Sequence, residues 1–149
     1  MKLYEDTCKI FTENQVEFIV IGGFAVNYWG YNRSTGDMDF FVNPNLKNLE
    51  RLFKALDKLG FVMDHESKDA IRRGELIHFS EDHQVIELLF KINLEKSFSD
   101  LIHNASFSRF GDTKIPFIGL EELIDEKTKS KREKDLQDIY QLKKINNLS

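Results

Sequence analysis

Apolar residues recur every three or four positions in several parts of the chain, which is the spacing of one helix face. Residues 2–14 show this pattern and predict an amphipathic first helix. Two more helices are predicted near the end of the chain, at 120–129 and 133–145. The clearest stripe predicts a helix that ends at Gly60, and its apolar positions are Leu46, Leu49, Leu52, Phe53, Leu56 and Leu59.

Short apolar runs predict the strands. Residues 17–21 are β-branched and aromatic with almost no polar alternation, which is typical of a strand buried on both faces. Gly22 and Gly23 end this strand, and residues 24–29 continue as a short helix. The other predicted elements are strands at 37–42, 76–80, 84–92, 107–110 and 114–118 and a helix at 94–103. Residues 61–64 are compatible with a strand, and 68–74 show no clear pattern.

Two carboxylates stand inside one of these strands. Asp37 and Asp39 lie in a segment that is otherwise apolar, and residues two apart in a strand face the same side. Like charges held close together are costly unless protons or a cation neutralise them. Glu87 stands alone in another apolar strand, where a charge also needs a partner. Three carboxylates of this kind can hold one or two Mg²⁺ ions, which prefer hard oxygen ligands.

The glycine pair before the two aspartates suggests a phosphate site. Glycine lets a ligand approach the backbone closely, and the following helix offers free N–H groups to phosphate. Gly22-Gly23 is therefore a plausible cradle for a triphosphate. Together with a metal-binding group of acids, it favours phosphoryl or nucleotidyl transfer.

Composition bears on the number of domains, the partners and the location of the protein, and it does not change the predicted chemistry. A chain of 149 residues suits a single domain, 1–149. Its net charge of −4 argues against broad binding to nucleic-acid backbone. One cysteine, Cys8, with no leader segment and no membrane-length apolar run, favours a cytoplasmic protein. The four histidines lack metal-ligand spacing; they are His65, His78, His83 and His103.

The order of these motifs resembles the nucleotidyltransferase superfamily, which has the polymerase β-like fold. Its signature is a hydrophobic residue and Gly-Gly, a spacer of about a dozen residues, then Asp-x-Asp, and here Ile21-Gly22-Gly23 and Asp37-Met38-Asp39 match it. The chain is also similar to a small bacterial branch related to AbiEii-type toxins of toxin–antitoxin systems. That narrower likeness rests on GGFAV, on Arg33-Ser34-Thr35, and on Lys127, Arg132 and Lys134-Asp135.

The resemblance implies a fold and a set of roles. The expected fold is α/β (α+β), with a mixed central β-sheet flanked by helices and followed by C-terminal helices. Asp37, Asp39 and Glu87 would be the catalytic metal ligands, with Mg²⁺ or Mn²⁺ as the cofactor. Gly22, Gly23, Arg33 and Lys127 would bind the nucleoside triphosphate. The acceptor hydroxyl would belong to RNA, a protein or a small molecule, and a cognate partner protein would accompany a toxin.

Each assignment has a structural alternative. Asp37 and Asp39 could merely start a strand and cap a neighbouring loop, and Gly22-Gly23 could form a simple tight turn. The third acid in this branch is usually Asp, and Glu87 extends about 1.5 Å further, roughly one C–C bond. Glu87 could instead form a buried ion pair, and Arg33 with Thr35 could simply order the loop. The basic run at 127–134 could be a solvated helix end or could contact phosphate or RNA. Trp29 could be a core residue or stack on a base with Tyr28 and Tyr31.

Two other functional classes follow from these alternatives. One is a catalytically idle nucleotidyltransferase fold that binds nucleotides or a partner protein, and Glu87 in place of Asp motivates it. The other is an antibiotic-modifying nucleotidyltransferase, which would share the chemistry and differ only in the acceptor.

Overall fold

A mixed β-sheet of six strands forms the centre of the described part of the protein. The computed structural model describes residues 2–130 and 132–149. The strands are β1 (Phe18–Ile21), β2 (Asp37–Val42), β3 (Ile77–Glu81), β4 (Gln84–Leu89), β5 (Ser106–Phe110) and β6 (Thr113–Phe117). They are arranged in the order β3-β4-β2-β1-β6-β5. β2 pairs with β4 and β1 with β6 in parallel, and the other neighbours are antiparallel.

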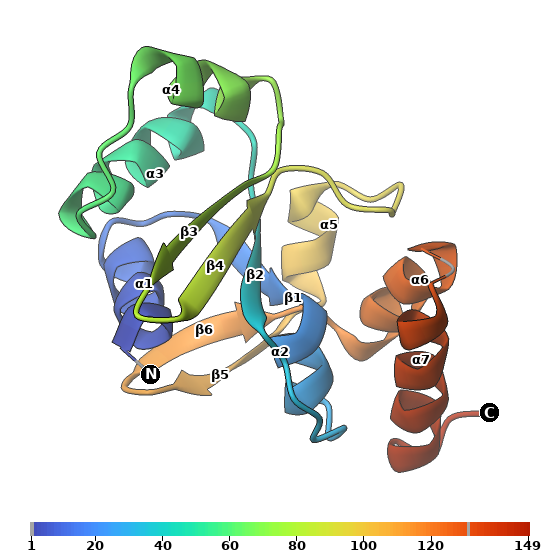
Figure 1. Cartoon of the computed structure of the whole chain (residues 1–149). Helices are drawn as coiled ribbons and strands as arrows, with labels where there is room; N and C mark the ends of the chain where they lie inside the picture. Colours follow the sequence, from blue (N-terminus) through green and yellow to red (C-terminus); the bar gives the residue numbers. More distant parts are fainter. Residues whose placement is uncertain (1, 131) are drawn as a thin grey trace.

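Helices pack on both faces of this sheet. They are α1 (Lys2–Glu13), α2 (Gly22–Tyr28), α3 (Leu46–Lys58), α4 (His65–Arg72), α5 (Phe98–His103), α6 (Leu120–Ser130) and α7 (Glu133–Ile145). Figure 1 shows α1, α3 and α4 on one side and α6 with α7 on the other. This arrangement confirms the expected mixed sheet flanked by helices. Within residues 2–130 and 132–149, the helices are all too short or too polar to span a membrane.

The two faces of the sheet carry two separate hydrophobic cores. Met38 and Phe40 of β2 point into the core that α1, α3 and α4 cover. Phe41 belongs to the second core, with residues of α2, α5, α6 and α7. All four residues of β1 are buried, which confirms the prediction of a strand covered on both faces. Asp37 and Asp39 alternate with Met38 and Phe40, so they lie on the face of the second core.

Helix α1 also fixes the strands that carry the acids. The Tyr4 hydroxyl donates a hydrogen bond to the Gly36 carbonyl, with 2.7 Å between the oxygens. The backbone N–H of Leu3 donates to Oε1 of Gln84 at 2.8 Å. Gly36 immediately precedes β2, and Gln84 is the first residue of β4. The N-terminal helix therefore ties down the starts of both acid-bearing strands.

Three local predictions need correction. Residues 61–64 form no strand, and a helix, α4, follows them because the Asp64 side chain accepts a hydrogen bond from the Ser67 N–H. Helix α5 begins at Phe98 rather than at residue 94, because Ser97 and Asp100 form a capping box there. Strand β4 ends at Leu89 rather than at residue 92.

Candidate active site

Asp37 and Asp39 extend from the same face of β2, as the alternation predicts. Asp37 is exposed at the start of the strand, while Asp39 is half-buried between the buried Met38 and Phe40. Asp39 lies directly opposite Ile21, the last residue of β1. The pair is therefore placed where β1 ends and α2 begins.

Glu87 meets this pair from the neighbouring strand. In the parallel pairing of β2 with β4, Glu87 is the direct partner of Asp39. One carboxylate oxygen from each of Asp37, Asp39 and Glu87 lies within 4.8 Å of the others. The longer Glu side chain thus remains within reach of the two aspartates. We call these three carboxylates the acidic triad, and their donor atoms suit a hard divalent cation such as Mg²⁺.

The acidic triad is electrostatically crowded. Burial, and then the charges of Glu87 and Asp37, raise the pKa of Asp39 to about 7. Burial and the charge of Asp37 also raise the pKa of Glu87. Among residues 2–130 and 132–149, no Lys, Arg or His forms an ion pair with any of the three carboxylates. The described residues therefore do not support a structural ion pair for Glu87. A cation or protons would relieve this repulsion.

The glycine pair packs against the acidic triad. Gly22 has a φ of +65°, and a Cβ added there would overlap the Asp39 carboxylate. A Cβ added at Gly23 would overlap the Thr35 hydroxyl. The two glycines are the first residues of α2 rather than a turn before it, which corrects the expected start of this helix at residue 24. Only glycine leaves room for the acid and an open backbone at this point.

A cleft of about 740 Å³ joins these groups. The acidic triad and Gly22-Gly23 lie on its sheet side, and α6 with the turn to α7 forms the opposite wall. The side chains of Ile21, Leu89 and Leu123 supply an apolar part of the lining. The cleft is therefore large enough for a nucleotide-sized ligand beside the acids.

The amino-acid sequence matches the model of a known protein family. The model described as "Nucleotidyl transferase of unknown function (DUF2204)" matches residues 1–148. The chain belongs to this nucleotidyl transferase family. The protein is accordingly a nucleotidyltransferase by family. No curated protein matches its sequence.

Several solved structures share the fold of this nucleotidyltransferase. The lincosamide antibiotic adenylyltransferase LnuA, solved with lincomycin bound, is 19% identical with a TM-score of 0.59, and the match covers 92% of each chain. ANT(2")-Ia, in complex with adenylyl-2"-tobramycin, is 10% identical with a TM-score of 0.58, covering 95% of this chain and 86% of that one. An antigenic nucleotidyltransferase-like protein from Paracoccidioides brasiliensis is 14% identical with a TM-score of 0.56, covering 95% and 74%.

At these identities the likeness concerns the fold alone. The superfamily expected from the sequence is supported by the family match and by these folds. The narrower AbiEii-related branch finds no support among these matches, and it stays a prediction.

Arg33 and Lys127 of the nucleotidyltransferase line the cleft but already have acidic partners. Nε and Nη2 of Arg33 each donate to the Asp138 carboxylate at 2.7 Å. The Lys127 ammonium lies 2.9 Å from Oδ2 of Asp138 and 3.1 Å from Oδ1 of Asp135. Both cations are thus fixed by α7, and Arg33 holds its loop against that helix.

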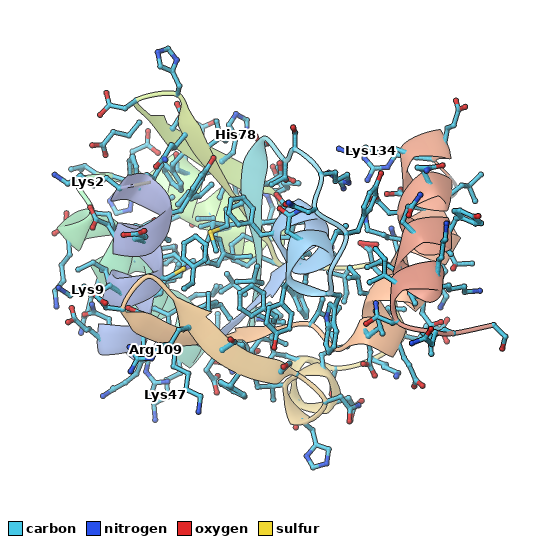
Figure 2. The ribbon with its side chains drawn as sticks, turned by 90° about the horizontal axis from the view of Figure 1, so that it is seen from below. Lys2, Lys9, Lys47, His78, Arg109 and Lys134 are labelled. Atoms are coloured by element: carbon cyan, nitrogen blue, oxygen red, sulfur yellow. The ribbon has the colours of Figure 1, made fainter. Side chains whose placement is uncertain are left out.

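The rest of the predicted basic run divides into two kinds of residue. Lys127 is buried, so the interpretation as a solvated helix end is wrong for this residue. Lys129, Arg132 and Lys134 are exposed and line the cleft at the turn between α6 and α7. Figure 2 shows Lys134 on the side of the C-terminal helices. Lys131 lies outside the described residues.

The aromatic residues near the glycine pair belong to the core. Trp29 Nε1 donates to the Ile118 carbonyl at 2.8 Å, and the Tyr28 ring stacks on Phe117 with 4.2 Å between centroids. Tyr31 packs against the second core. None of these three lines the cleft, so the core interpretation of Trp29 is favoured over base stacking.

The sequence predicts no site role for four residues near the acids. Glu126 lines the cleft from α6, and burial raises its pKa. His78 is the cross-strand partner of Glu87. Asp135 and Asp138 are nearly inaccessible and hold the basic residues. Asp135 and Asp138 share one face of α7 with the buried Leu142, and this helical spacing is the pattern that could have predicted their burial.

Proposed function

We propose that this nucleotidyltransferase moves a nucleoside monophosphate from a nucleoside triphosphate to an acceptor hydroxyl, with Mg²⁺ as the cofactor. The observation that carries the proposal is the meeting of Asp37, Asp39 and Glu87 beside Gly22-Gly23 in one cleft. Uncompensated carboxylates are costly in a partly buried site. Their close approach in this cleft favours a role in holding a cation and substrate.

The three acids have complementary roles in this proposal. Asp37, Asp39 and Glu87 would hold Mg²⁺ or Mn²⁺, which supplies Lewis-acid stabilisation of phosphate charge. Glu87 completes the acidic triad from the neighbouring strand, and it would also accept the proton of the acceptor hydroxyl. The hydroxyl oxygen would then bond to the α-phosphorus while pyrophosphate leaves.

The triphosphate would lie along the glycine pair. Gly22 and Gly23 present no side chain, so phosphate oxygens can approach their backbone. Arg33 lies beside this position, with its Nη1 at 3.5 Å from where a Cβ of Gly23 would be. Lys127 adds a fixed positive charge from α6. Because both cations are bound to Asp138, we propose that they act mainly by their position and their field.

The acceptor is a hydroxyl compound, and its class defines the biological role. LnuA and ANT(2")-Ia carry antibiotics in their solved structures, which supports a small-molecule acceptor as one candidate. The resemblance to AbiEii-type toxins supports RNA or protein as an acceptor and a cognate antitoxin as a partner. The idle binding module is motivated by Glu87 in place of Asp, but Glu87 is in register with Asp39, which favours a complete acidic triad.

The test is transfer of label from α-labelled nucleoside triphosphates in the presence of Mg²⁺. Acceptors would be total tRNA, a protein mixture, lincomycin and tobramycin, each with the wild type and Asp39→Asn. Asp69→Asn is the matched control, because Asp69 is an exposed residue of α4. We expect label on one acceptor class with the wild type and the control only. Equal labelling by Asp39→Asn, or none by any protein, would count against the proposal.

A toxin role has its own test. Induced expression in a bacterial host would arrest growth with the wild type and with Asp69→Asn, and not with Asp39→Asn. Normal growth with the wild type at the same protein level would contradict the toxin role and leave a metabolic acceptor.

A further inference from the structure

The cations of the cleft differ in how much of their hydrogen-bonding capacity is used. Arg33 donates from Nε and Nη2 to Asp138 and from Nη1 to the Ser34 carbonyl. Lys127 is buried between Asp135 and Asp138. Neither has much capacity left for a substrate that carries several negative charges. A further cation with free donors would therefore complement these two in binding a triphosphate.

Arg132 is differently placed. It precedes α7 as its N-cap residue, at the mouth of the cleft, and its side chain is 71% exposed. Its Nε donates to Oδ2 of Asp135 at 2.7 Å and its Nη2 to Oδ1 at 3.3 Å. Within the described residues, its Nη1 has no hydrogen-bond partner. One edge of the guanidinium is thus fixed, and the other is open to a ligand.

The acidic partner of Arg132 is itself firmly held. Asp135 is almost completely buried and also accepts hydrogen bonds from Lys127 and from the Ser130 hydroxyl. Burial alone raises the pKa of Asp135, but hydrogen bonds from Arg132, Ser130 and Lys127 outweigh it and lower the pKa to about 2. Asp135 is therefore a permanent anion that orients Arg132 and limits the conformational entropy lost on binding.

These contacts form a chain of alternating charge along one wall of the cleft. It runs from Arg33 through Asp138, Lys127 and Asp135 to Arg132. Three cations and two anions leave one positive charge in excess. Because the side chains of Arg33 and Lys127 are 15% and 6% exposed and that of Arg132 is 71% exposed, the excess is presented at Arg132. The charges of Asp39 and Glu126 act on Arg132, so its field also reaches the acidic triad.

We propose that Arg132 binds the β- and γ-phosphates of the nucleoside triphosphate and stabilises the pyrophosphate that leaves; the inference rests on the proposed nucleotidyl transfer. In that step the acceptor oxygen bonds to the α-phosphorus, and the bond from the α-phosphorus to the bridging oxygen breaks. The bridging oxygen keeps the electron pair, and the hydroxyl proton passes to a carboxylate or to water. A planar guanidinium with an open edge suits the negative charge that accumulates on the leaving oxygens.

The test measures binding of the leaving group itself. Isothermal titration calorimetry with sodium pyrophosphate, in Mg²⁺, would compare the wild type with Arg132→Met and Arg132→Lys. Arg109→Met is the matched control, because Arg109 is an exposed arginine of β5 and Figure 2 shows it away from the C-terminal helices. We expect an affinity loss of about tenfold or more for Arg132→Met, a smaller loss for Arg132→Lys, and no change for Arg109→Met. Equal affinity of Arg132→Met and the wild type would overturn the inference.

A second titration separates this inference from the proposed function. The ligands are Mn²⁺ alone and a non-hydrolysable α,β-methylene ATP with Mg²⁺. Arg132→Met should bind Mn²⁺ as the wild type does, because the acidic triad is intact, and should bind the ATP analogue more weakly. If the wild type binds neither ligand, the proposed function and the inference both fail. If the wild type binds both and Arg132→Met binds the analogue equally well, only the inference fails.

Discussion

The protein holds two groups of acids, one that lines the cleft and one that is buried on α7, and their surroundings are opposite. Asp37, Asp39 and Glu87 lie together on the sheet, and the described cations form ion pairs with none of them. Asp135 and Asp138 lie on α7, and each bonds to two cationic side chains. Crowding and burial raise the pKa of Asp39 to about 7. Hydrogen bonds from Arg132, Ser130 and Lys127 overcome the effect of burial and lower the pKa of Asp135 to about 2.

The acids of α7 are paired with cationic side chains, whereas the acidic triad has no cationic partner among the described residues. The α7 acids hold two helices and a loop together, so their charge is used within the fold. The acidic triad has no such use in the metal-free protein and costs stability there. This contrast predicts that the two groups respond in opposite ways to substitution, metal and pH.

The largest effect is expected for Asp39→Asn. Removing this charge takes one ligand from the acidic triad, and we expect the rate of nucleotidyl transfer to fall by about 1,000-fold or more. Thermal unfolding without metal should show a protein at least as stable as the wild type, because repulsion is relieved. A variant that is both inactive and clearly less stable would mean that Asp39 serves the fold, as the α7 acids do.

Asp138→Ala, in contrast to Asp39→Asn, should destabilise the fold. Arg33 and Lys127 would lose their shared partner, and we expect the free energy of unfolding to fall by about 3 kcal/mol, typical of breaking a buried pair. Urea denaturation measures this change. Glu75→Ala is the control, because its pair with Arg73 is exposed and should contribute little to stability. A loss no larger than the control's would show that this carboxylate is dispensable for the fold.

Gly22→Ala tests the space beside the acidic triad. The positive φ and the overlap with the Asp39 carboxylate should cost about 1–2 kcal/mol of stability and displace that ligand. Mn²⁺ titration should show an affinity loss of about tenfold. Gly36→Ala is the matched control, because a Cβ there meets nothing within 4 Å. Similar results for the two variants would contradict a tight glycine position.

The smallest effect is the dependence of stability on pH. Because the pKa of Asp39 is about 7 in the folded protein, well above its unfolded value, the stability of the metal-free protein should decline as the pH rises from about 4 to 7. The decline should be about 1–2 kcal/mol, since the cleft is open to water. The pKa values of Asp135 and Asp138 are lowered, so their contribution is lost only as the pH falls below about 4.

Urea unfolding in a chelator, at pH 5 and pH 8, measures this decline. Asp39→Asn should lack it, and comparison with the wild type removes the contribution of other titrating groups. Parallel pH profiles for the two proteins would exclude Asp39 as its source.

The acids of the candidate site could be read from the sequence because their signal is local. Asp37 and Asp39 share a strand face by alternation, and Glu87 is conspicuous in an apolar run. Their meeting depends on the pairing of β2 with β4, which is non-local and sets the register of Asp39 with Glu87. The helices with strong stripes, such as α3, were predicted nearly to the residue.

The errors arose where long-range packing overrides local pattern. Lys127 stands in a basic run that looks solvated, but two acids of the next helix bury it. Phe61 and Met63 alternate as in a strand, yet the Phe61 ring stacks on Phe79 of β3 from an irregular segment. In α4, the Asp64 cap was a local signal that the sequence reasoning missed.

The parallel pairing of β2 with β4 also bears on the order of folding. Between the two strands the chain passes through α3, α4 and β3. Contacts that close such a long segment tend to form after local ones, because the entropy of closure is lost before the contact is gained. We therefore expect Asp39 and Glu87 to come together in a late step. A cation bound between them would act mainly by slowing unfolding, so the ion would give the finished protein kinetic stability without hastening its formation.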